Sequence, residues 1–158
     1  MDCSKLTSVS FESGSPLMRL MIDDYAFANS GLVSINIPAS VMSIGEKSFW
    51  RCSRLTSVSF ESGSRIKTIG KNAYYTSGLN GSITLPASVT SIGSHALPGC
   101  PSLTSLIFES GSQLTTIDYW AFASTYLKNI TIPASVTSIE RRAFIGSRLT
   151  SATFESGS

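Results

Sequence analysis

Short stretches of the chain alternate apolar and polar residues with a period of two, and these stretches recur at regular intervals. Examples are Val9-Ser10-Phe11 and Ile130-Thr131-Ile132, in which every second side chain is apolar. Such alternation predicts a β-strand with one buried face. Successive strands open 22 to 26 residues apart, at Leu6, Leu32, Leu55, Leu79 or Asn80, Leu103, Leu127 and Leu149. A period of this length is typical of a solenoid, in which each repeat forms one coil.

Two kinds of loop follow the predicted strands and divide the coils into long and short ones. The sequence Phe-Glu-Ser-Gly-Ser stands at 11–15, 60–64, 108–112 and 154–158. The sequence Pro-Ala-Ser-Val stands at 38–41, 86–89 and 133–136. Proline ends a ladder of hydrogen bonds because it has no N–H, and glycine allows the longer loop to turn. The alternation of long and short coils predicts six full coils and a seventh opening strand.

The strands enter each coil in the same phase, so we expect neighbouring strands to be parallel, with a crossover between them. Each crossover carries a second apolar pair, such as Val89 and Ile92, which turns inward again. The segment that closes a coil, such as 94–97, is too short for more than one helical turn. About two extra residues near 21–24 predict a local bulge in the first coil.

The composition narrows the classes of function. Charged residues make up 14% of the chain and hydrophobic residues 42%, and the formal net charge is +2. Without a basic run, the chain lacks the electrostatic pattern of a nucleic-acid-binding protein. It has neither an apolar run of about 18 residues nor a signal-like N-terminus, so as given it predicts no membrane insertion. Because an array of coils has no internal boundary, we predict one solenoid over residues 1–158.

The three cysteines occupy one position of the repeat on alternate coils. Cys3, Cys52 and Cys100 each stand three residues before an opening leucine. With strands about 4.8 Å apart, positions two coils apart are separated by about 10 Å, whereas a disulfide needs Cα atoms within about 7 Å. We therefore expect reduced, half-buried turn residues. The alternative is an exposed Cys3 that pairs between chains.

Two segments carry a family resemblance: Ile-Pro-Ala-Ser-Val-Thr-Ser-Ile at 132–139 and Ile-Gly-Glu-Lys-Ser-Phe-Trp-Arg-Cys at 44–52. Over nearly its whole length the chain resembles the BspA-like leucine-rich repeats. The resemblance implies a right-handed α/β solenoid with little helix and a parallel sheet of about seven short strands on its concave face. It also implies a secreted or cell-surface protein, commonly tied to adhesion to host proteins or other cells, with no catalytic residues to carry over.

Residues of the kinds used in catalysis do not form a site in the sequence. His95 is the only histidine and has no cysteine or aspartate at metal-ligand spacing. Lys47 and Arg142 hold its position in other coils, so we interpret it as an exposed turn residue. Ser64 and Lys67 match a fragment of a serine-nucleophile motif whose companion motifs are absent. We predict no enzyme, no metal site and no cofactor.

The outward positions of the predicted strands form a nearly uncharged face rich in hydroxyl groups. The concave sheet of a repeat scaffold is its usual binding surface. We therefore predict a host or cell-surface protein or a glycan as the partner, rather than nucleic acid; the alternative is a generic solvated face. The candidate residues are Ser34, Asn36, Ser57, Ser59, Ser82, Thr84, Ser105, Ile107, Asn129 and Thr131.

Other side chains recur beside this face and at the coil closures. Glutamates form a ladder at one edge, which we interpret as a solvated rim; the alternative is a surface for a cationic or metal-bridged partner. The glutamates are Glu12, Glu61, Glu109 and Glu155. Aromatic residues at the closures are expected to flank the core on the convex side: Tyr25, Trp50, Tyr74, Tyr75, Tyr119, Trp120 and Tyr126. Asn80 and Asn129 match the N-glycosylation pattern, and whether they are modified stays open.

The two ends of the chain suggest a second class of function. Stable solenoids need polar terminal caps, yet the first strand opens at Leu6 and the chain stops at Ser158, in the same phase as Ser64. We expect apolar core and unpaired strand edges at both ends, which invite strand addition. The alternative function is therefore a structural protein that associates end to end. The other explanation of these ends is a chain that forms part of a longer array.

Overall fold

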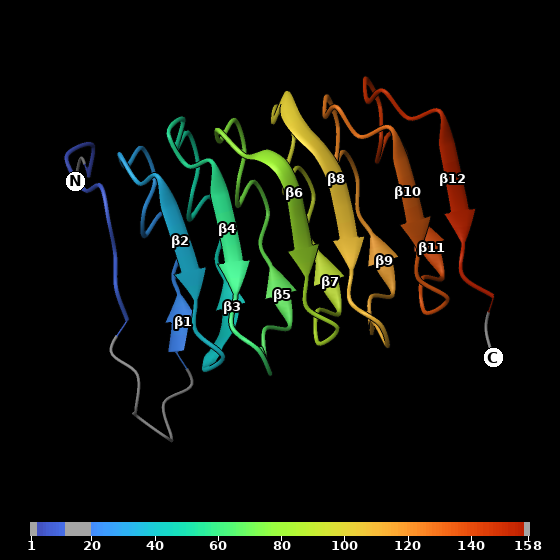
Figure 1. The fold of residues 1–158 in the computed structure, drawn as a ribbon, viewed down its shortest axis with the longest axis horizontal. Helices are drawn as coiled ribbons and strands as arrows, with labels where there is room; N and C mark the ends of the chain where they lie inside the picture. Colours follow the sequence, from blue (N-terminus) through green and yellow to red (C-terminus); the bar gives the residue numbers. More distant parts are fainter. Residues whose placement is uncertain (1–2, 12–19, 157–158) are drawn as a thin grey trace.

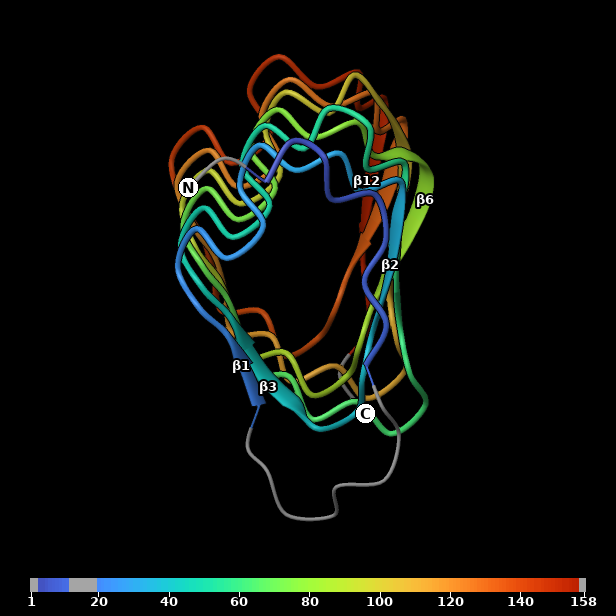
Figure 2. The same cartoon turned by 90° about the vertical axis from the view of Figure 1, so that its left-hand side faces the viewer.

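The chain winds into a β-solenoid of about six turns, with its coils side by side from the N-terminus to the C-terminus (Figure 1). This computed structural model describes residues 3–11 and 20–156. Each coil has two walls of parallel strands joined by loops and turns, as the view along the axis shows (Figure 2). The predicted parallel coil is confirmed. Glu12 and its loop lie outside the described residues.

One wall is a continuous parallel sheet with one short strand from each coil. Its strands are, in order, β1 (Leu20–Ile22), β3 (Val41–Ile44), β5 (Thr68–Ile69), β7 (Ser91–Ile92), β9 (Thr116–Ile117) and β11 (Ser138–Ile139). They arise from the second apolar pair of each coil, which the sequence pattern did not predict as strands. The register of β1 with β3 shifts between Leu20 and Met21, which pair with Val41 and Ser43, so the extra residue is Met42 of β3. The bulge expected near 21–24 of the first coil stays a prediction.

The other wall, here called the long-strand face, is built from six of the seven predicted opening strands. The first, with Val9-Ser10-Phe11, is wrong: no strand forms within residues 3–11. The six are β2 (Ser34–Ile37), β4 (Ser57–Phe60), β6 (Asn80–Leu85), β8 (Ser102–Phe108), β10 (Asn129–Ile132) and β12 (Ser151–Phe154). They form three two-stranded parallel sheets, β2–β4, β6–β8 and β10–β12, rather than one continuous sheet. Among the described residues, no ladder joins β4 to β6 or β8 to β10. We call the interruption between β4 and β6 the first seam and the interruption between β8 and β10 the second seam.

The two kinds of loop explain where the seams fall. Asn36 and Ser59, on paired strands joined through a Pro-Ala-Ser loop, are 23 residues apart. Across a Glu-Ser-Gly-Ser loop the equivalent step is longer: from Val58 to Ile83 it is 25 residues (83 − 58). We attribute the seams to this difference, because a longer loop can place the next strand too far away to complete the ladder. The long and short coils therefore pair, and each pair is one unit of the face.

The core between the walls is apolar and contains a stack of aromatic rings. Phe27 and Phe49 have ring centroids 5.4 Å apart, and Phe49 and Tyr74 have centroids 5.0 Å apart with nearly parallel rings. Tyr74 is 0% exposed. Its expected place on the convex flank is therefore wrong, because it occupies the repeat position that Phe49 and Phe122 hold in other coils.

A ladder of turns closes the coils. Backbone N–H groups of one coil donate to carbonyl oxygens of the next, as from Phe27 to Ser48 and from Asn29 to Trp50, both at 2.8 Å. Tyr25 and Asn29 lie in the left-handed region, with φ of 58° and 56°. This conformation costs an L-residue roughly 1–2 kcal/mol, which the ladder helps to offset. The described residues form no helix, and thus none long and apolar enough to cross a membrane.

The cysteines are free thiols, as predicted. Cys3 is half-buried as expected, but Cys52 and Cys100 are fully buried, so the expected half-burial is wrong for these two. The Sγ of Cys52 lies 3.3 Å from the hydroxyl of Ser30, and that of Cys100 lies 3.4 Å from the hydroxyl of Ser77. Burial raises the pKa of both buried thiols. These cysteines therefore act as small polar core residues.

Candidate binding site

The predicted binding residues all lie on the long-strand face, where they alternate with buried side chains. All ten are exposed except Ser105, which is half-buried. The register places Asn36 beside Ser59 and Thr84 beside Ile107, so equivalent positions form rows within each strand pair. The seams then divide these rows into separate patches.

Many polar groups on this face are bonded to one another. Ser59 donates its hydroxyl to Oδ1 of Asn36 at 2.9 Å, and Ser151 donates to Oδ1 of Asn129 at 2.8 Å. The hydroxyls of Thr131 and Thr153 share a hydrogen bond of 3.1 Å. Such pairs fix the side chains and reduce the number of groups that are free to meet a ligand.

The glutamates beside the face have a structural role that the sequence pattern did not predict. Oε2 of Glu61 accepts a hydrogen bond from the N–H of Ala39 at 3.0 Å, and Glu109 accepts one from Ala87 at 3.0 Å. Glu155 makes the equivalent contact with the N–H of Ala134 at 3.4 Å. Each glutamate thus binds the Pro-Ala-Ser loop of the preceding coil. This role could have been predicted from the sequence, because Pro-Ala recurs one coil before each of these glutamates.

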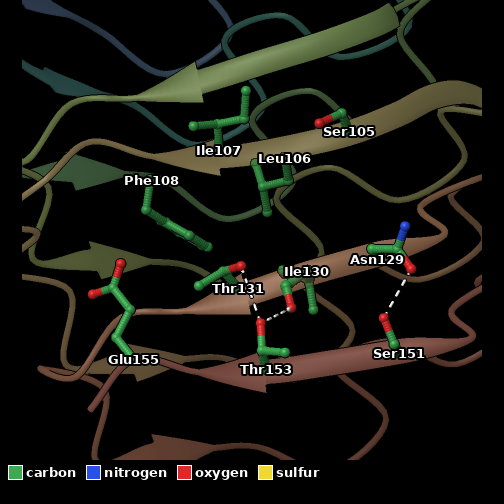
Figure 3. A pocket seen from close by; sticks show the side chains of 10 residues that line it. All are labelled: Ser105, Leu106, Ile107, Phe108, Asn129, Ile130, Thr131, Ser151, Thr153 and Glu155. Atoms are coloured by element: carbon green, nitrogen blue, oxygen red, sulfur yellow. Dashed lines mark hydrogen bonds between the residues drawn. The ribbon is translucent and has the colours of Figure 1, made fainter. Parts of the chain in front are cut away.

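A hollow of about 410 Å³ opens over the second seam (Figure 3). We call it the seam pocket. It is lined by Ser105, Leu106, Ile107, Phe108, Asn129, Ile130, Thr131, Ser151, Thr153 and Glu155. Four of these are candidates named from the sequence (Ser105, Ile107, Asn129 and Thr131), and the other candidates lie elsewhere on the face.

The two ends of the seam pocket differ in chemistry. Figure 3 shows Phe108 and Glu155 at one end and Ser105, Asn129 and Ser151 at the other. Ile107 is 47% exposed, although it stands in a row of polar side chains. Glu155 is the only ionisable side chain of the lining. The pocket therefore combines an apolar stretch with a carboxylate at one end and an amide at the other.

His95 lies away from this face and forms no site. Its ring stacks on that of Trp120 with centroids 5.5 Å apart, and the ring of Tyr119 meets it edge-on at 5.5 Å. Burial, aided by Lys71, lowers the pKa of His95. It lies in a turn, as expected, but it is only partly exposed because these rings cover it. Within the described residues, no group of three or more histidine, cysteine or acidic side chains could hold a metal ion.

A solenoid with one leucine-opened strand in each coil, joined by parallel pairing, defines a leucine-rich repeat protein. The family model described as BspA type Leucine rich repeat region matches six copies, over residues 1–81 and 59–158. The chain belongs to this family.

Solved structures of bacterial leucine-rich repeat proteins are similar to the chain. The pneumococcal vaccine antigen PcpA is 32% identical with a TM-score of 0.74, over 78% of this chain and 31% of the antigen. A leucine rich cell surface protein from Faecalibacterium prausnitzii is 27% identical with a TM-score of 0.60, over 85% of this chain and 42% of that one. A leucine-rich repeat protein from Bacteroides capillosus is 30% identical with a TM-score of 0.55, over 80% of this chain and 79% of that one.

The first two of these structures are much longer than the matched region. The chain spans 31% of the pneumococcal antigen and 42% of the Faecalibacterium protein. No curated protein matches the chain in the comparison made.

Proposed function

We propose that the chain is a non-catalytic adhesion module that binds a protein or glycan of a host or cell surface. Its binding surface is the long-strand face, centred on the seam pocket. The proposed location is extracellular or on the cell surface, in keeping with the cell-surface protein of Faecalibacterium prausnitzii that the chain resembles.

The observation that carries this proposal is the seam pocket itself. Ligand sites are usually concave and combine apolar surface with a few placed polar groups. Of the ten residues that line this pocket, four are apolar and six are polar. Here Leu106 and Ile130 are buried beneath the pocket, while Asn129 and Glu155 supply polar groups at its ends. Repeat scaffolds present such surfaces on rigid strands, and two strand pairs meet at this one.

Two variants that introduce the same residue on different walls test the proposal. Ile107→Arg places a long charged side chain in the seam pocket, and Thr68→Arg places one on the exposed surface of β5. Binding of the whole chain to immobilised host-cell surface extracts is measured by biolayer interferometry. We expect Ile107→Arg to weaken binding about tenfold, the cost of losing a central contact. Equal effects of both variants, or no binding by the unmodified chain, would contradict the proposal.

A further inference from the structure

We propose that the seam pocket binds a cationic side chain, that of an arginine or lysine, presented by a protein partner. This inference rests on the proposed function, since it names the ligand class of the same site. It also chooses between the two kinds of partner, a protein and a glycan, that the face would suit.

The charge of the pocket supports a cationic ligand. Glu155 is its only ionisable side chain, so no lysine or arginine of the lining neutralises it. An anionic group such as a phosphate, sulfate or uronic acid would meet a carboxylate and no cation. A cation within about 4 Å of the carboxylate is attracted instead.

The carboxylate of Glu155 is also less engaged than its repeat equivalents. Its contact with the N–H of Ala134 is 3.4 Å, whereas Glu61 and Glu109 make the same contact at 3.0 Å. A hydrogen bond of 3.4 Å is well beyond the usual length of about 2.9 Å for N–H···O. Glu155 is therefore held less firmly by the preceding loop than Glu61 and Glu109 are.

The apolar stretch fits the stem of such a side chain. Arginine and lysine carry three or four methylene groups that pack on apolar surface while the charged head stays polar. Ile107 exposes 47% of its surface beside this path, and Phe108 lies at the same end as Glu155 (Figure 3). A guanidinium placed there meets the carboxylate of Glu155, and a charge-assisted hydrogen bond to it favours a cation.

A neutral sugar fits the pocket less well. Some of the polar groups that would bind sugar hydroxyls are already paired: the hydroxyls of Thr131 and Thr153 with each other, and the hydroxyl of Ser151 with Oδ1 of Asn129. Phe108, the only aromatic residue of the lining, is half-buried, which limits the ring surface on which a sugar could stack. The observations therefore favour a basic segment of a protein.

The experiment is an NMR titration of the ¹⁵N-labelled 158-residue chain with two blocked pentapeptides, Gly-Gly-Arg-Gly-Gly and its citrulline twin. Citrulline keeps the stem and shape of arginine but carries no charge. We expect the arginine peptide to shift amide signals of 105–108, 129–131 and 151–155. The citrulline peptide should bind about tenfold more weakly, as for loss of a charge-assisted hydrogen bond.

Two glutamate variants and one isoleucine variant test whether the arginine peptide binds in the seam pocket. Glu155→Gln should reduce the affinity for the arginine peptide about tenfold, whereas Glu109→Gln, the matched change in a neighbouring long coil, should leave it unchanged. Ile107→Ser, which installs the residue found at the equivalent Ser59, should also weaken binding while Glu155 stays in place. The NMR spectrum of each variant, recorded before peptide is added, shows whether the variant folds.

Three results would overturn the inference. They are equal binding of the arginine and citrulline peptides, equal effects of the two glutamate variants, and shifts confined to another part of the chain. Parallel titration with lactose separates this inference from the proposed function. Shifts of the pocket amides by lactose but not by the arginine peptide would reject a cationic ligand while leaving a binding role for the face.

Discussion

Tyr74 lies entirely inside the core, in a stack of rings with Phe49 and Phe27. Its hydroxyl has no hydrogen-bond partner within the part of the chain that the structure describes. Cys52 and Cys100 are also buried, but each sits beside a serine hydroxyl. At the scale of single residues, the position in the repeat decides whether a side chain is buried. The buried polar atoms differ in their hydrogen bonding: the two thiols lie beside serine hydroxyls, whereas the Tyr74 hydroxyl has no partner among the described residues.

We predict that Tyr74→Phe stabilises the protein. An unsatisfied buried hydroxyl costs about 1–3 kcal/mol, and the phenylalanine keeps the ring that stacks on Phe49. The free energy of unfolding, measured by urea denaturation, should rise by about 1 kcal/mol. Tyr75→Phe, at an exposed neighbour, is the control and should change little. A loss of stability in Tyr74→Phe would show that the hydroxyl has a partner in solution.

The pH dependence of the same variant follows from the pKa of Tyr74. Burial raises that pKa well above its usual value of 10. The phenol of Tyr74 loses its proton near pH 10 in the unfolded chain but keeps it in the folded one. Ionisation therefore favours the unfolded chain above about pH 10, and the free energy of unfolding of the unmodified protein falls there, whereas below that pH this effect is absent. The stability advantage of Tyr74→Phe over the unmodified chain should therefore grow above that pH. A constant advantage would contradict the assigned burial.

At the scale of elements, the loops decide how the strands of one face meet. The Pro-Ala-Ser loop is short and is followed by a paired strand, while the Glu-Ser-Gly-Ser loop is longer and is followed by a seam. A glutamate directly follows the second strand of each pair: Glu61, Glu109 and Glu155. Each of them also accepts a hydrogen bond from the Pro-Ala-Ser loop of the preceding coil. One residue thus fastens the two coils of a pair at the edge of their sheet.

We predict that this fastening can be measured by substituting single glutamates. Glu61→Ala removes the acceptor for the N–H of Ala39 and should lower the free energy of unfolding by about 0.5–1 kcal/mol. Glu61→Gln keeps an acceptor and should lie close to the unmodified chain. Glu155→Ala, which breaks a contact of 3.4 Å rather than 3.0 Å, should cost less. Thermal unfolding of the three variants checks this order, and a larger effect at Glu155 would reverse our interpretation.

Most strands with clear alternation could be predicted from the sequence, although Val9-Ser10-Phe11 shows the same alternation and is not a strand, and the sheets were predicted only in part. Ser34–Ile37 and Asn129–Ile132 show the period of two and are strands. Thr68–Ile69 is a strand of two residues, too short to carry any period, and its existence depends on pairing with the coils on either side. The six-stranded sheet was therefore missed although its inward isoleucines were recognised.

The candidate site was predictable at the level of a face and not of a pocket. Asn129 and Thr131 were found because outward strand positions can be read from the alternation. The pocket itself depends on a seam, which reflects how loop length sets the separation of strands in three dimensions. It also needs Ser151, Thr153 and Glu155 from the next coil, and nothing in the local pattern links them to Ile107.

At the scale of the whole molecule, the two walls differ in continuity. The six-stranded sheet runs from β1 to β11 without a break, whereas the long-strand face is interrupted at two seams. The solenoid is therefore held together along one wall and along its ladder of turns, while the other wall consists of three separate strand pairs. Since repeat arrays are stabilised chiefly through neighbouring coils, the seams should be the weaker junctions on that face.

Hydrogen exchange measured by NMR should detect this difference directly. In β5, β7 and β9 each strand has a bonded neighbour on both sides, so we expect their amides to exchange slowly. Strands β4, β6, β8 and β10 are paired on one side only. Successive N–H groups of a strand point to opposite sides, so slow and fast exchange should alternate along them, with the fast amides facing a seam. Uniformly slow exchange in β8 and β10 would mean that the second seam closes in solution, and the seam pocket would then lose its structural basis.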